Sequence, residues 1–391
     1  MSTDVEKQFV ATIKVIGVGG AGNNAVNRMA KEHMEGVEFW AVNTDAQVLF
    51  SVDVENKITL GENITKGLGA GARPDVGKQA AEASLDALKN AIRGADMVFI
   101  AAGMGGGTGT GASPVIARLC REMGCLTIGI VTRPFTFEGK VRNEHAVEGL
   151  QKLRQNVDSL IVISNDQLLQ MSGDIPLSDS FGQADDILCH SVKTITELIL
   201  QPAIINLDFA DVRNIMLNKG TALIGMGRGR GDNMAREAAE QAVSSPLLEA
   251  SISGARNAIV NIKGGRKMTL LDANEAVEIV REAAGDSDIN VIFGVSVDQS
   301  LDDEMLVTVI ATEFVGGDIH KVSHPNITGK GSMTLDLGSN QIQRVDSEIF
   351  KNAKKKGDEN QFFSPEKEAG RTEPLADDDS MLPAFLRRRN N

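Results

Sequence analysis

The sequence predicts an α/β protein: a doubly wound parallel-sheet domain, a long connecting helix, a second smaller α+β domain and a disordered C-terminal tail. Three observations predict this organisation. In the first half, short apolar runs alternate with segments of helical apolar spacing. After Pro202 there are fewer helical segments per strand, and after about Gly316 the periodicity fades. The expected divisions are a flexible N-terminus at 1–12, the first domain at 13–178, the connecting helix at 179–202, a loop and helix at 203–220, the second domain at 221–316, a linker at 317–376 and a terminal peptide at 377–391.

Length and composition exclude several classes of protein. A chain of 391 residues suits two domains with a tail, and a formal net charge of −13 lacks the basic footprint of nucleic-acid binding. No apolar run approaches the roughly 20 residues that span a bilayer, and the N-terminus does not have the pattern of a secretory signal. Three unevenly spaced cysteines fit a reducing cytoplasm rather than a disulfide framework or a zinc site. We therefore expect a cytoplasmic protein that binds proteins and small ligands.

The first domain has a strand-then-helix order. Its expected strands are 13–18, 37–42, 97–102, 126–131 and 159–164, and its expected helices are 25–34, 75–92, one ending near Met123 and one opened by residues 136–139. Ligands of such sheets bind at the carboxyl ends of the parallel strands. Gly22, Asn43, Gly103, Pro134 and Asn165 all fall at such ends, so we expect the site there.

The stretch Gly103–Gly111 holds six glycines and two threonines, between a buried strand and a helix that we expect to begin at Pro114. Glycines let backbone N–H groups approach phosphate oxygens, and the helix dipole adds to the attraction. Thr108 and Thr110 supply hydroxyl donors. Residues 90–139 contain no lysine, so this is not a P-loop, in which a lysine reaches the β/γ-phosphates. The stretch predicts a phosphate loop that relies on backbone, hydroxyls and a metal.

A second glycine motif follows the first strand. Gly17, Gly19 and Gly22 satisfy G-x-G-x-x-G in the strand-to-helix context that the motif requires. The next strand ends at Asn43–Asp45, and an acidic residue about 20 positions after the glycines is what a nicotinamide-dinucleotide site uses on the ribose. A nicotinamide-dependent oxidoreductase is therefore a competing hypothesis. It is the weaker one, because one dinucleotide pyrophosphate does not need two phosphate loops.

Three polar residues, Asn206, Asp208 and Asp211, lie among apolar neighbours just after the connecting helix. Two carboxylates three positions apart at a helix start share one face and lie about 5–6 Å apart at Cβ. Helix capping explains them on local grounds, because the dipole favours Asp at an N-terminus. Such a cluster also suits the polarisation of a water and the binding of a cation, and both interpretations stay open at this point.

The second domain is expected to have strands at 221–226, 255–262, 289–297 and 305–312 and helices at 233–243 and 271–284, with a loop at Gly227–Gly231. The polar segment 357–379 cannot bury enough apolar surface to order itself. The chain then closes on an apolar cluster that we expect to dock into a groove of a partner protein. This cluster consists of Met381, Leu382, Pro383, Phe385 and Leu386.

The run Gly105–Gly111 resembles the signature loop of the tubulin/FtsZ family of GTPases, and essentially the whole chain resembles the bacterial cell-division members of that family. Asn206-x-Asp208-x-x-Asp211, Gly19–Asn24, Asn43–Asp45 and the Pro383–Leu386 tail match the family pattern as well. The resemblance implies GTP and GDP as ligands, Mg²⁺, and head-to-tail assembly into filaments of the division ring at mid-cell.

The resemblance also implies roles for individual residues. The nucleotide is expected to contact Gly20, Ala21, Gly22, Asn23, Asn24 and Asn43, and its phosphates are expected to lie on Gly103, Gly105, Gly106, Gly107, Thr108, Gly109 and Thr110. Glu138 and Arg142 are expected near the ribose and phosphates, and Phe181, Asp186 and Asn165 near the guanine.

In the family the cluster Asn206, Asp208 and Asp211 is supplied to the nucleotide of the neighbouring subunit, so hydrolysis needs assembly. Mg²⁺ is then held by phosphates and water, with no protein ligand assigned. The terminal peptide is expected to dock membrane-tethering and regulatory division proteins, without direct membrane insertion. A tubulin-like filament protein that binds nucleotide without hydrolysis is a third hypothesis beside the GTPase and the oxidoreductase.

Overall fold

The computed structural model describes residues 11–32, 34–172, 177–201, 203–248, 250–285 and 289–314, with the backbone alone for 169–172 and 177–181. All of these belong to one compact unit, Met1–Ser323. The linker expected at 317–376 and the terminal peptide at 377–391 lie outside the described residues.

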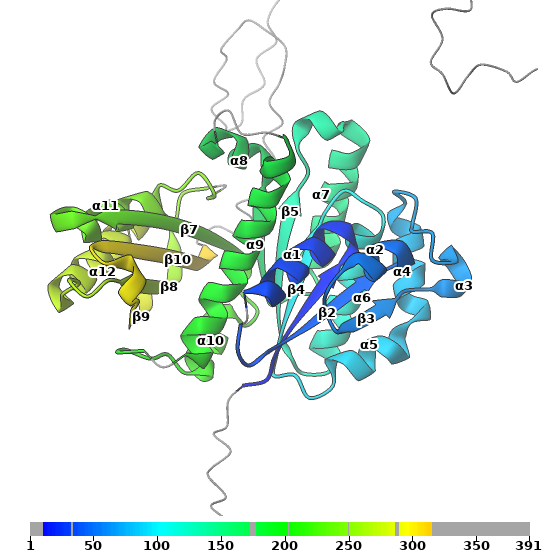
Figure 1. Cartoon of the computed structure of the whole chain (residues 1–391), viewed down its shortest axis with the longest axis horizontal. Helices are drawn as coiled ribbons and strands as arrows, with labels where there is room; N and C mark the ends of the chain where they lie inside the picture. The colour runs from blue at the N-terminus through cyan, green and yellow to red at the C-terminus, as the bar shows by residue number, and fades with distance from the viewer. Residues whose placement is uncertain are drawn as a thin grey trace, which may run out of the picture. The chain divides into compact units, whose positions relative to one another are not determined.

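One continuous sheet of ten strands runs through the described chain, in the order β3-β2-β1-β4-β5-β6-β7-β10-β8-β9 (Figure 1). The strands from β3 to β7 are parallel, β10 is antiparallel to β7 and β8, and β9 is parallel to β8. The strands are β1 Ile13–Val18, β2 Val37–Asn43, β3 Asn56–Thr59, β4 Met97–Gly103, β5 Leu126–Arg133, β6 Ser159–Ser164, β7 Gly220–Arg230, β8 Ala255–Gly264, β9 Asn290–Val297 and β10 Glu304–Phe314. The parallel first half confirms the doubly wound fold predicted from the sequence.

Helices cover both faces of the first half of the sheet. The helices of the described chain are α1 Gly19–Lys31, α2 Ala46–Ser51, α3 Glu62–Thr65, α4 Pro74–Ala83, α5 Leu85–Ile92, α6 Thr108–Glu122, α7 Lys140–Arg154, α8 Asn165–Ser172, α9 Leu177–Leu200, α10 Phe209–Met216, α11 Met234–Val243 and α12 Leu270–Ala284. Buried side chains of α1, α9 and α10 share one core with the strands, and those of α4, α5, α6 and α7 share the core on the opposite face. In the second half, α11 and α12 pack on β8 and β10.

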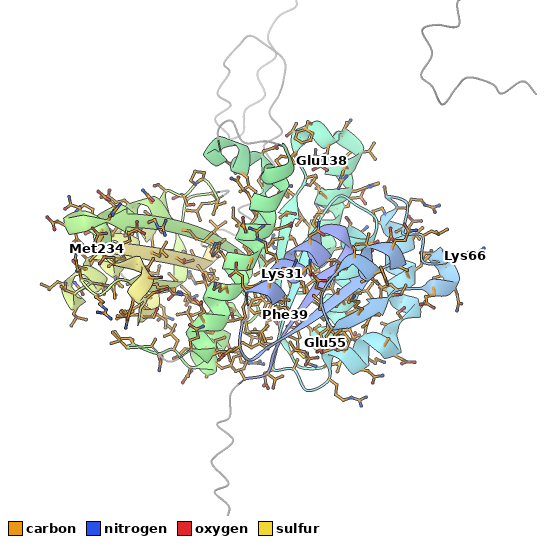
Figure 2. The ribbon with its side chains drawn as sticks, in the orientation of Figure 1. Lys31, Phe39, Glu55, Lys66, Glu138 and Met234 are labelled. Atoms are coloured by element: carbon orange, nitrogen blue, oxygen red, sulfur yellow. The ribbon has the colours of Figure 1, made fainter. Side chains whose placement is uncertain are left out.

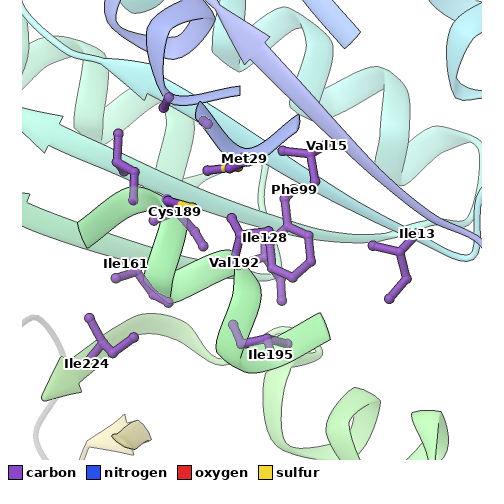
Figure 3. Close-up of a cluster of buried hydrophobic side chains, with 14 of the residues drawn as sticks. Ile13, Val15, Met29, Phe99, Ile128, Ile161, Cys189, Val192, Ile195 and Ile224 are labelled. Carbon is purple, nitrogen blue, oxygen red and sulfur yellow. The ribbon is translucent and has the colours of Figure 1, made fainter. Parts of the chain in front are cut away.

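Successive side chains of each strand point to opposite faces of the sheet and so contribute to the two cores in turn. In β4, Phe99 belongs to the core under α9, whereas its neighbours Val98 and Ile100 belong to the core under α6. Figure 3 shows Phe99 with residues of neighbouring strands facing Val192 and Ile195 of α9. Both faces of β4 are fully buried, which explains why its sequence is an unbroken apolar run.

Helix α9 joins the two halves, as the sequence predicts, and spans Leu177–Leu200 rather than 179–202. Two ion pairs attach it on either side. Lys193 Nζ lies 2.6 Å from a carboxylate oxygen of Glu32 after α1, and Glu197 accepts from Lys263 of β8 at 2.8 Å. The two domains expected from the sequence also share their sheet, because β6 and β7 pair over three residues. The halves are therefore bound through both the helix and the strand ladder.

Two helix predictions in the first half were wrong in their details. The segment 75–92 forms two helices, α4 and α5, separated at Ser84, whose Oγ accepts a hydrogen bond from Gly61 N at 2.9 Å. Helix α6 begins at Thr108 and not at Pro114, so the proline lies inside it. The threonines and later glycines of the loop are therefore already helical. The short elements α2, β3 and α3 between residues 46 and 65 were not expected.

The expected loop at Gly227–Gly231 was also wrong, because β7 continues to Arg230. Gly225, Gly227 and Gly229 lie on one face of this strand by the two-residue period. A Cβ on Gly227 would lie 2.1 Å from the carbonyl oxygen of Ala238, and one on Gly225 would lie 2.0 Å from that of Ala242. These glycines let the backbone of α11 pack directly on the strand, which is why a glycine-rich sequence is strand here.

Candidate functional site

The two glycine motifs meet at the centre of the sheet. They follow β1 and β4, which are adjacent, and the chain winds outward in opposite directions from this pair. This is the switch point at which doubly wound sheets bind ligands. A Cβ on Gly19 would lie 2.8 Å from Gly109 N, and one on Gly109 would lie 2.5 Å from Gly103 O. The motifs therefore form one surface at the carboxyl ends of the strands, as predicted.

Two helix N-termini open on this surface. Helix α1 begins at Gly19 and α6 at Thr108, and neither has a side-chain cap or an acidic residue in its first turn. By contrast, Asp208 caps α10 and Thr269 caps α12. The first N–H groups of a helix have no partners within it, and its N-terminus carries partial positive charge. The pair of uncapped N-termini is suited to bind the phosphates of one ligand.

The glycines of the two motifs divide into packed and open positions. A Cβ on Gly22 would lie 2.3 Å from Ala101 O, one on Gly103 would lie 2.7 Å from Ala21 Cβ, and one on Gly107 would lie 2.8 Å from Ala70 Cβ. By contrast, a Cβ on Gly20 or Gly106 would have nothing within 4 Å. The packed glycines bring the loops together, and the open ones leave bare backbone for a ligand.

The two threonines of the loop have partners within the protein. Thr110 is buried, and its Oγ1 accepts a hydrogen bond from Gly105 N at 2.8 Å. Thr108 Oγ1 lies 2.6 Å from Thr44 Oγ1. Thr110 thus fixes the shape of the loop from behind, whereas the Thr44–Thr108 pair joins the loop to the end of β2.

Asn23 and Asn43 lie beneath the site. Asn43 Nδ2 donates to Asn23 Oδ1 at 2.8 Å, and Asn23 Nδ2 donates to Gly17 O at 2.8 Å and to Val42 O at 3.3 Å. Both side chains are buried. They hold the ends of β1 and β2 together, while Ala21 and Asn24 of the same loop are exposed.

Glu138 and Arg142 form an ion pair at the same end of the sheet, where Figure 2 labels Glu138. Arg142 Nε lies 3.0 Å from Glu138 Oε2, and Glu138 Oε1 accepts from Phe135 N at 2.8 Å. The Arg142 backbone also approaches the phosphate loop, because a Cβ on Gly105 would lie 2.7 Å from Arg142 O. The nearly buried carboxylate thus positions an exposed guanidinium beside the loop.

Asn165 carries the feature that points most directly to a missing ligand. It follows the last residue of β6 and is 6% exposed. Its Oδ1 is the buried side-chain oxygen that has no hydrogen-bond partner among the described residues. An unpaired buried acceptor is costly, so such groups in native proteins have an unseen partner. A base with N–H donors fits this acceptor.

The remaining expected base contacts lie on α9. Phe181 is in this helix, and its side chain lies outside the described residues. Asp186 forms an ion pair with Arg28 of α1. Its neighbour Asp185 was not singled out in the sequence; burial raises its pKa to about 7, against the lowering effect of Arg28, and Asp186 raises it further.

Replacing Asp185 with asparagine is expected to stabilise the nucleotide-free protein at pH 8. The folded pKa of about 7 exceeds the usual value of 3.8, so the folded state binds a proton that the unfolded state has lost. Stability therefore falls as the pH rises through this interval and is constant above it. The gain in unfolding temperature from Asp185→Asn should be absent near pH 4 and reach a plateau above pH 7. A gain of equal size at both ends would contradict the assignment.

The polar cluster expected to be catalytic lies elsewhere. Asp211 N donates to Asp208 Oδ1 at 2.8 Å, Asp208 N donates to Asp211 Oδ2 at 3.5 Å, and Asn206 Oδ1 accepts from Ala203 N at 2.6 Å. The two aspartates thus form a capping box on α10. Met216 at the end of α10 accepts from Ser159 Oγ, at the first residue of β6 (2.6 Å), so α10 lies at the amino end of this strand (Figure 1). The glycine loops lie at the carboxyl ends, about 20 Å away along a six-residue strand.

Three contributors to the site were missed in the sequence. Thr44 contacts Thr108, Arg28 pairs with Asp186, and the loop at 67–73 packs on the phosphate loop through Ala70. No pattern in the sequence marks these contacts, because each joins distant segments. Among the described residues, no three His, Cys, Asp or Glu side chains come together as a metal site.

The geometry indicates a site for a phosphate-containing ligand, and comparison with known proteins agrees with this. Residues 12–173 match the GTPase domain of the tubulin/FtsZ family, and residues 220–315 match the C-terminal domain of the FtsZ family. The FtsZ dimer of M. jannaschii, solved empty, is 42% identical to this chain, with a TM-score of 0.75 over 78% of this chain and 89% of that one. A point mutant of the same M. jannaschii protein, in which a tyrosine replaces a tryptophan, has the same identity and TM-score and is covered to 92%.

More distant structures share the fold. CetZ1 of Haloferax volcanii, a GDP-bound monomer, is 19% identical with a TM-score of 0.69, over 78% of this chain and 95% of that one. CetZ2 of Haloferax volcanii, a GTPγS-bound protofilament, is 20% identical with a TM-score of 0.66, over 77% of this chain and 92% of that one. The two matched domains and the 42% identity to the M. jannaschii protein, together with the central glycine loops, show that the chain belongs to the FtsZ branch of the tubulin/FtsZ family of cytoskeletal GTPases.

Proposed function

We propose that this chain is a GTPase that polymerises head to tail into the filaments of a bacterial division ring, and that Asp208 and Asp211 of one subunit act on the GTP of its neighbour. The observation that carries the proposal is the separation of the two parts of the site. The aspartates begin α10, whose last residue contacts the amino end of β6, and the glycine loops lie at the carboxyl ends of β1 and β4. Stacking two chains along the strand direction brings the parts together.

The chain's own groups account for nucleotide binding. The uncapped N-termini of α1 and α6 bind the phosphates, Arg142 lies beside them, and Asn165 Oδ1 accepts from an N–H of the guanine. When bound, Mg²⁺ neutralises charge on the β- and γ-phosphate oxygens. Because the capping box uses Asp208 Oδ1 and Asp211 Oδ2, the other carboxylate oxygens are left to orient a water or take its proton.

Exposed apolar side chains at both ends of the molecule support the head-to-tail contact. Near the glycine loops, Leu68 is 77% and Phe137 62% exposed. At the other end, Ile204, whose N–H donates to Val295 O at 2.9 Å, is 72% exposed, and Leu271 at the start of α12 is 80% exposed. Burial of such residues between subunits removes apolar surface from water. A contact between two different surfaces extends into open filaments when the rotation does not close.

In this proposal, partner proteins determine where the filament lies in the cell. The terminal peptide, with Met381, Leu382, Pro383, Phe385 and Leu386, docks onto membrane-tethering and regulatory division proteins, which hold the filament at mid-cell on the inner face of the membrane. No helix within the described part of the chain is both long and apolar enough to cross a bilayer.

Phosphate release from GTP should show a concentration threshold. We expect the rate per chain, measured with Mg²⁺ over a dilution series, to collapse below a critical protein concentration, because an isolated chain lacks half of the catalytic site. A rate per chain that stays constant on dilution would mean that one chain holds a complete site, and the assembly mechanism would fail. If GTP binds but no phosphate appears at any concentration, the protein is a nucleotide-binding filament without hydrolysis.

A further inference from the structure

A large cavity lies outside the nucleotide site. It has a volume of about 540 Å³ and lies between α4, α6 and α7, on the face of the sheet opposite to α9. This volume is typical of sites for small organic ligands. Neither Gly20 nor Gly106 lines this cavity.

Each of the three helices contributes a cation to this cavity: Lys78 from α4, Arg118 from α6 and Lys152 from α7. The imidazole of His145 also lines the cavity, and Asp75 and Glu148 supply the two carboxylates of the lining. Asp75 is already paired with Arg73 at 3.1 Å, which lowers the pKa of Asp75. The cavity therefore holds more positive than negative charge, although the whole chain is strongly acidic.

The three cations have loose partners. Lys78 lies 3.8 Å from Glu82, Arg118 lies 3.7 Å from Glu122 and Lys152 lies 3.6 Å from Glu148, and every one of these side chains is at least 40% exposed. Exposed pairs of this kind contribute roughly 0–1 kcal/mol. The pair Lys263–Glu197 is closer at 2.8 Å and much less exposed. A ligand anion can therefore replace these partner carboxylates at small cost.

The wall formed by α6 adds an acceptor and apolar surface. Pro114 lies inside the helix and has no N–H, so the carbonyl of Thr110 has lost its helical donor. Thr110 and Pro114 both line the cavity, together with Val115 and Pro74. A ligand that fits this lining combines an apolar body with a multiply charged anion.

We propose that this cavity binds a small organic phosphate monoester and that its occupancy affects the nearby phosphate loop. The dianion binds Lys78, Arg118 and Lys152, because three cations match a doubly charged phosphate better than a single carboxylate. The organic body lies on Val115 and Pro114.

Contacts on the far side of the cavity wall connect it to the loop. Thr110 Oγ1 accepts from Gly105 N at 2.8 Å, and a Cβ on Gly149 of α7 would lie 2.3 Å from Thr110 Cγ2. Helix α4 directly follows the segment that packs on Gly107. A ligand that fixes the spacing of the three helices therefore also fixes the loop. This effect on GTP turnover rests on the proposed function, whereas binding to the cavity does not.

Binding should be measured by titrating phenyl phosphate into the full chain saturated with GDP, so that the phosphate loop is already filled. We expect saturable binding of phenyl phosphate and no such binding of phenol. The affinity for phenyl phosphate should fall at least tenfold in Arg118→Gln and in Lys78→Gln. Lys89→Gln, which removes the charge of an exposed α5 side chain outside the cavity, should bind phenyl phosphate like the native protein. Equal unfolding temperatures of the three variants show that each is folded.

Each other outcome overturns the proposal. Binding to the nucleotide-free chain that is absent from the GDP-saturated chain would place phenyl phosphate in the nucleotide site. Equal loss of binding in Lys89→Gln would reveal only a general charge effect. Equal binding of phenol would make the cavity an apolar site without phosphate recognition. These results do not depend on hydrolysis, so they stay distinct from a failure of the GTPase proposal. In a hydrolysing protein, phenyl phosphate should also change the turnover of the native chain but not of Arg118→Gln.

Discussion

Replacing Asp208 or Asp211 with alanine is expected to abolish GTP hydrolysis and to leave GTP binding intact. Both residues begin α10, which contacts the amino end of β6, whereas the glycine loops of the same chain lie at the carboxyl ends of the strands, so we expect neither aspartate to contribute to the binding site of its own chain. Loss of a residue that orients or deprotonates the attacking water reduces turnover by about 10²–10⁴-fold. Phosphate release and equilibrium binding of GTP, measured on the same preparations, test this.

An asparagine variant separates catalysis from capping. Asparagine caps a helix as well as aspartate does, and alanine costs about 1 kcal/mol at that position. If Asp208 only caps α10, Asp208→Asn should be as active and as stable as the native protein. If its charge is catalytic, Asp208→Asn should be stable and inactive. Mixing this variant with a chain that cannot bind GTP should restore part of the hydrolysis, because each chain supplies what the other lacks.

Replacing Gly20 with alanine is expected to weaken nucleotide binding while it stabilises the empty protein. A Cβ at Gly20 has nothing within 4 Å, and the residue lies in the first turn of α1. In a helix alanine is favoured over glycine by up to about 1 kcal/mol. A nucleotide on the uncapped N-terminus would meet the added methyl group, and we expect affinities for GTP and GDP to fall at least tenfold, or about 1.4 kcal/mol.

Two further glycine variants serve as comparisons for this test. Gly106→Ala also adds a Cβ in open space and should likewise lower affinity in a folded protein. Gly109→Ala places a Cβ 2.5 Å from Gly103 O and should destabilise the empty protein itself. Calorimetric binding and thermal unfolding distinguish the two classes. Unchanged affinity in both Gly20→Ala and Gly106→Ala would mean that the nucleotide does not lie on these N-termini.

The parallel half of the fold was predictable because its strands are buried on both faces. Runs such as Met97–Gly103 are apolar throughout, so they are readily recognised in the sequence as buried strands. The errors came from features that depend on distant backbone. Gly227 and Gly229 continue the strand where the backbone of α11 packs directly on them, and Ser84 separates two helices where its hydroxyl accepts from Gly61 N. Pro114 is tolerated within α6, whereas local rules place a proline at a helix start.

The site was predictable to the extent that it is made of backbone. Two glycine motifs after two strands imply phosphate binding, and the parallel order brings them to the same edge. The sequence could not show that Asn23 and Asn43 bind each other, or that Thr110 faces Gly105, since these contacts depend on side-chain packing. The unpaired oxygen of Asn165 likewise became visible only with the fold.

The continuous sheet has a mechanical consequence. A pull applied between the glycine loops and α10 runs along β1, β4, β5 and β6, so it loads the ladder between these parallel strands in shear. Many hydrogen bonds then resist together, whereas a pull across the strands would break them one after another. A chain of such subunits under tension should part at the contacts between molecules before any molecule unravels.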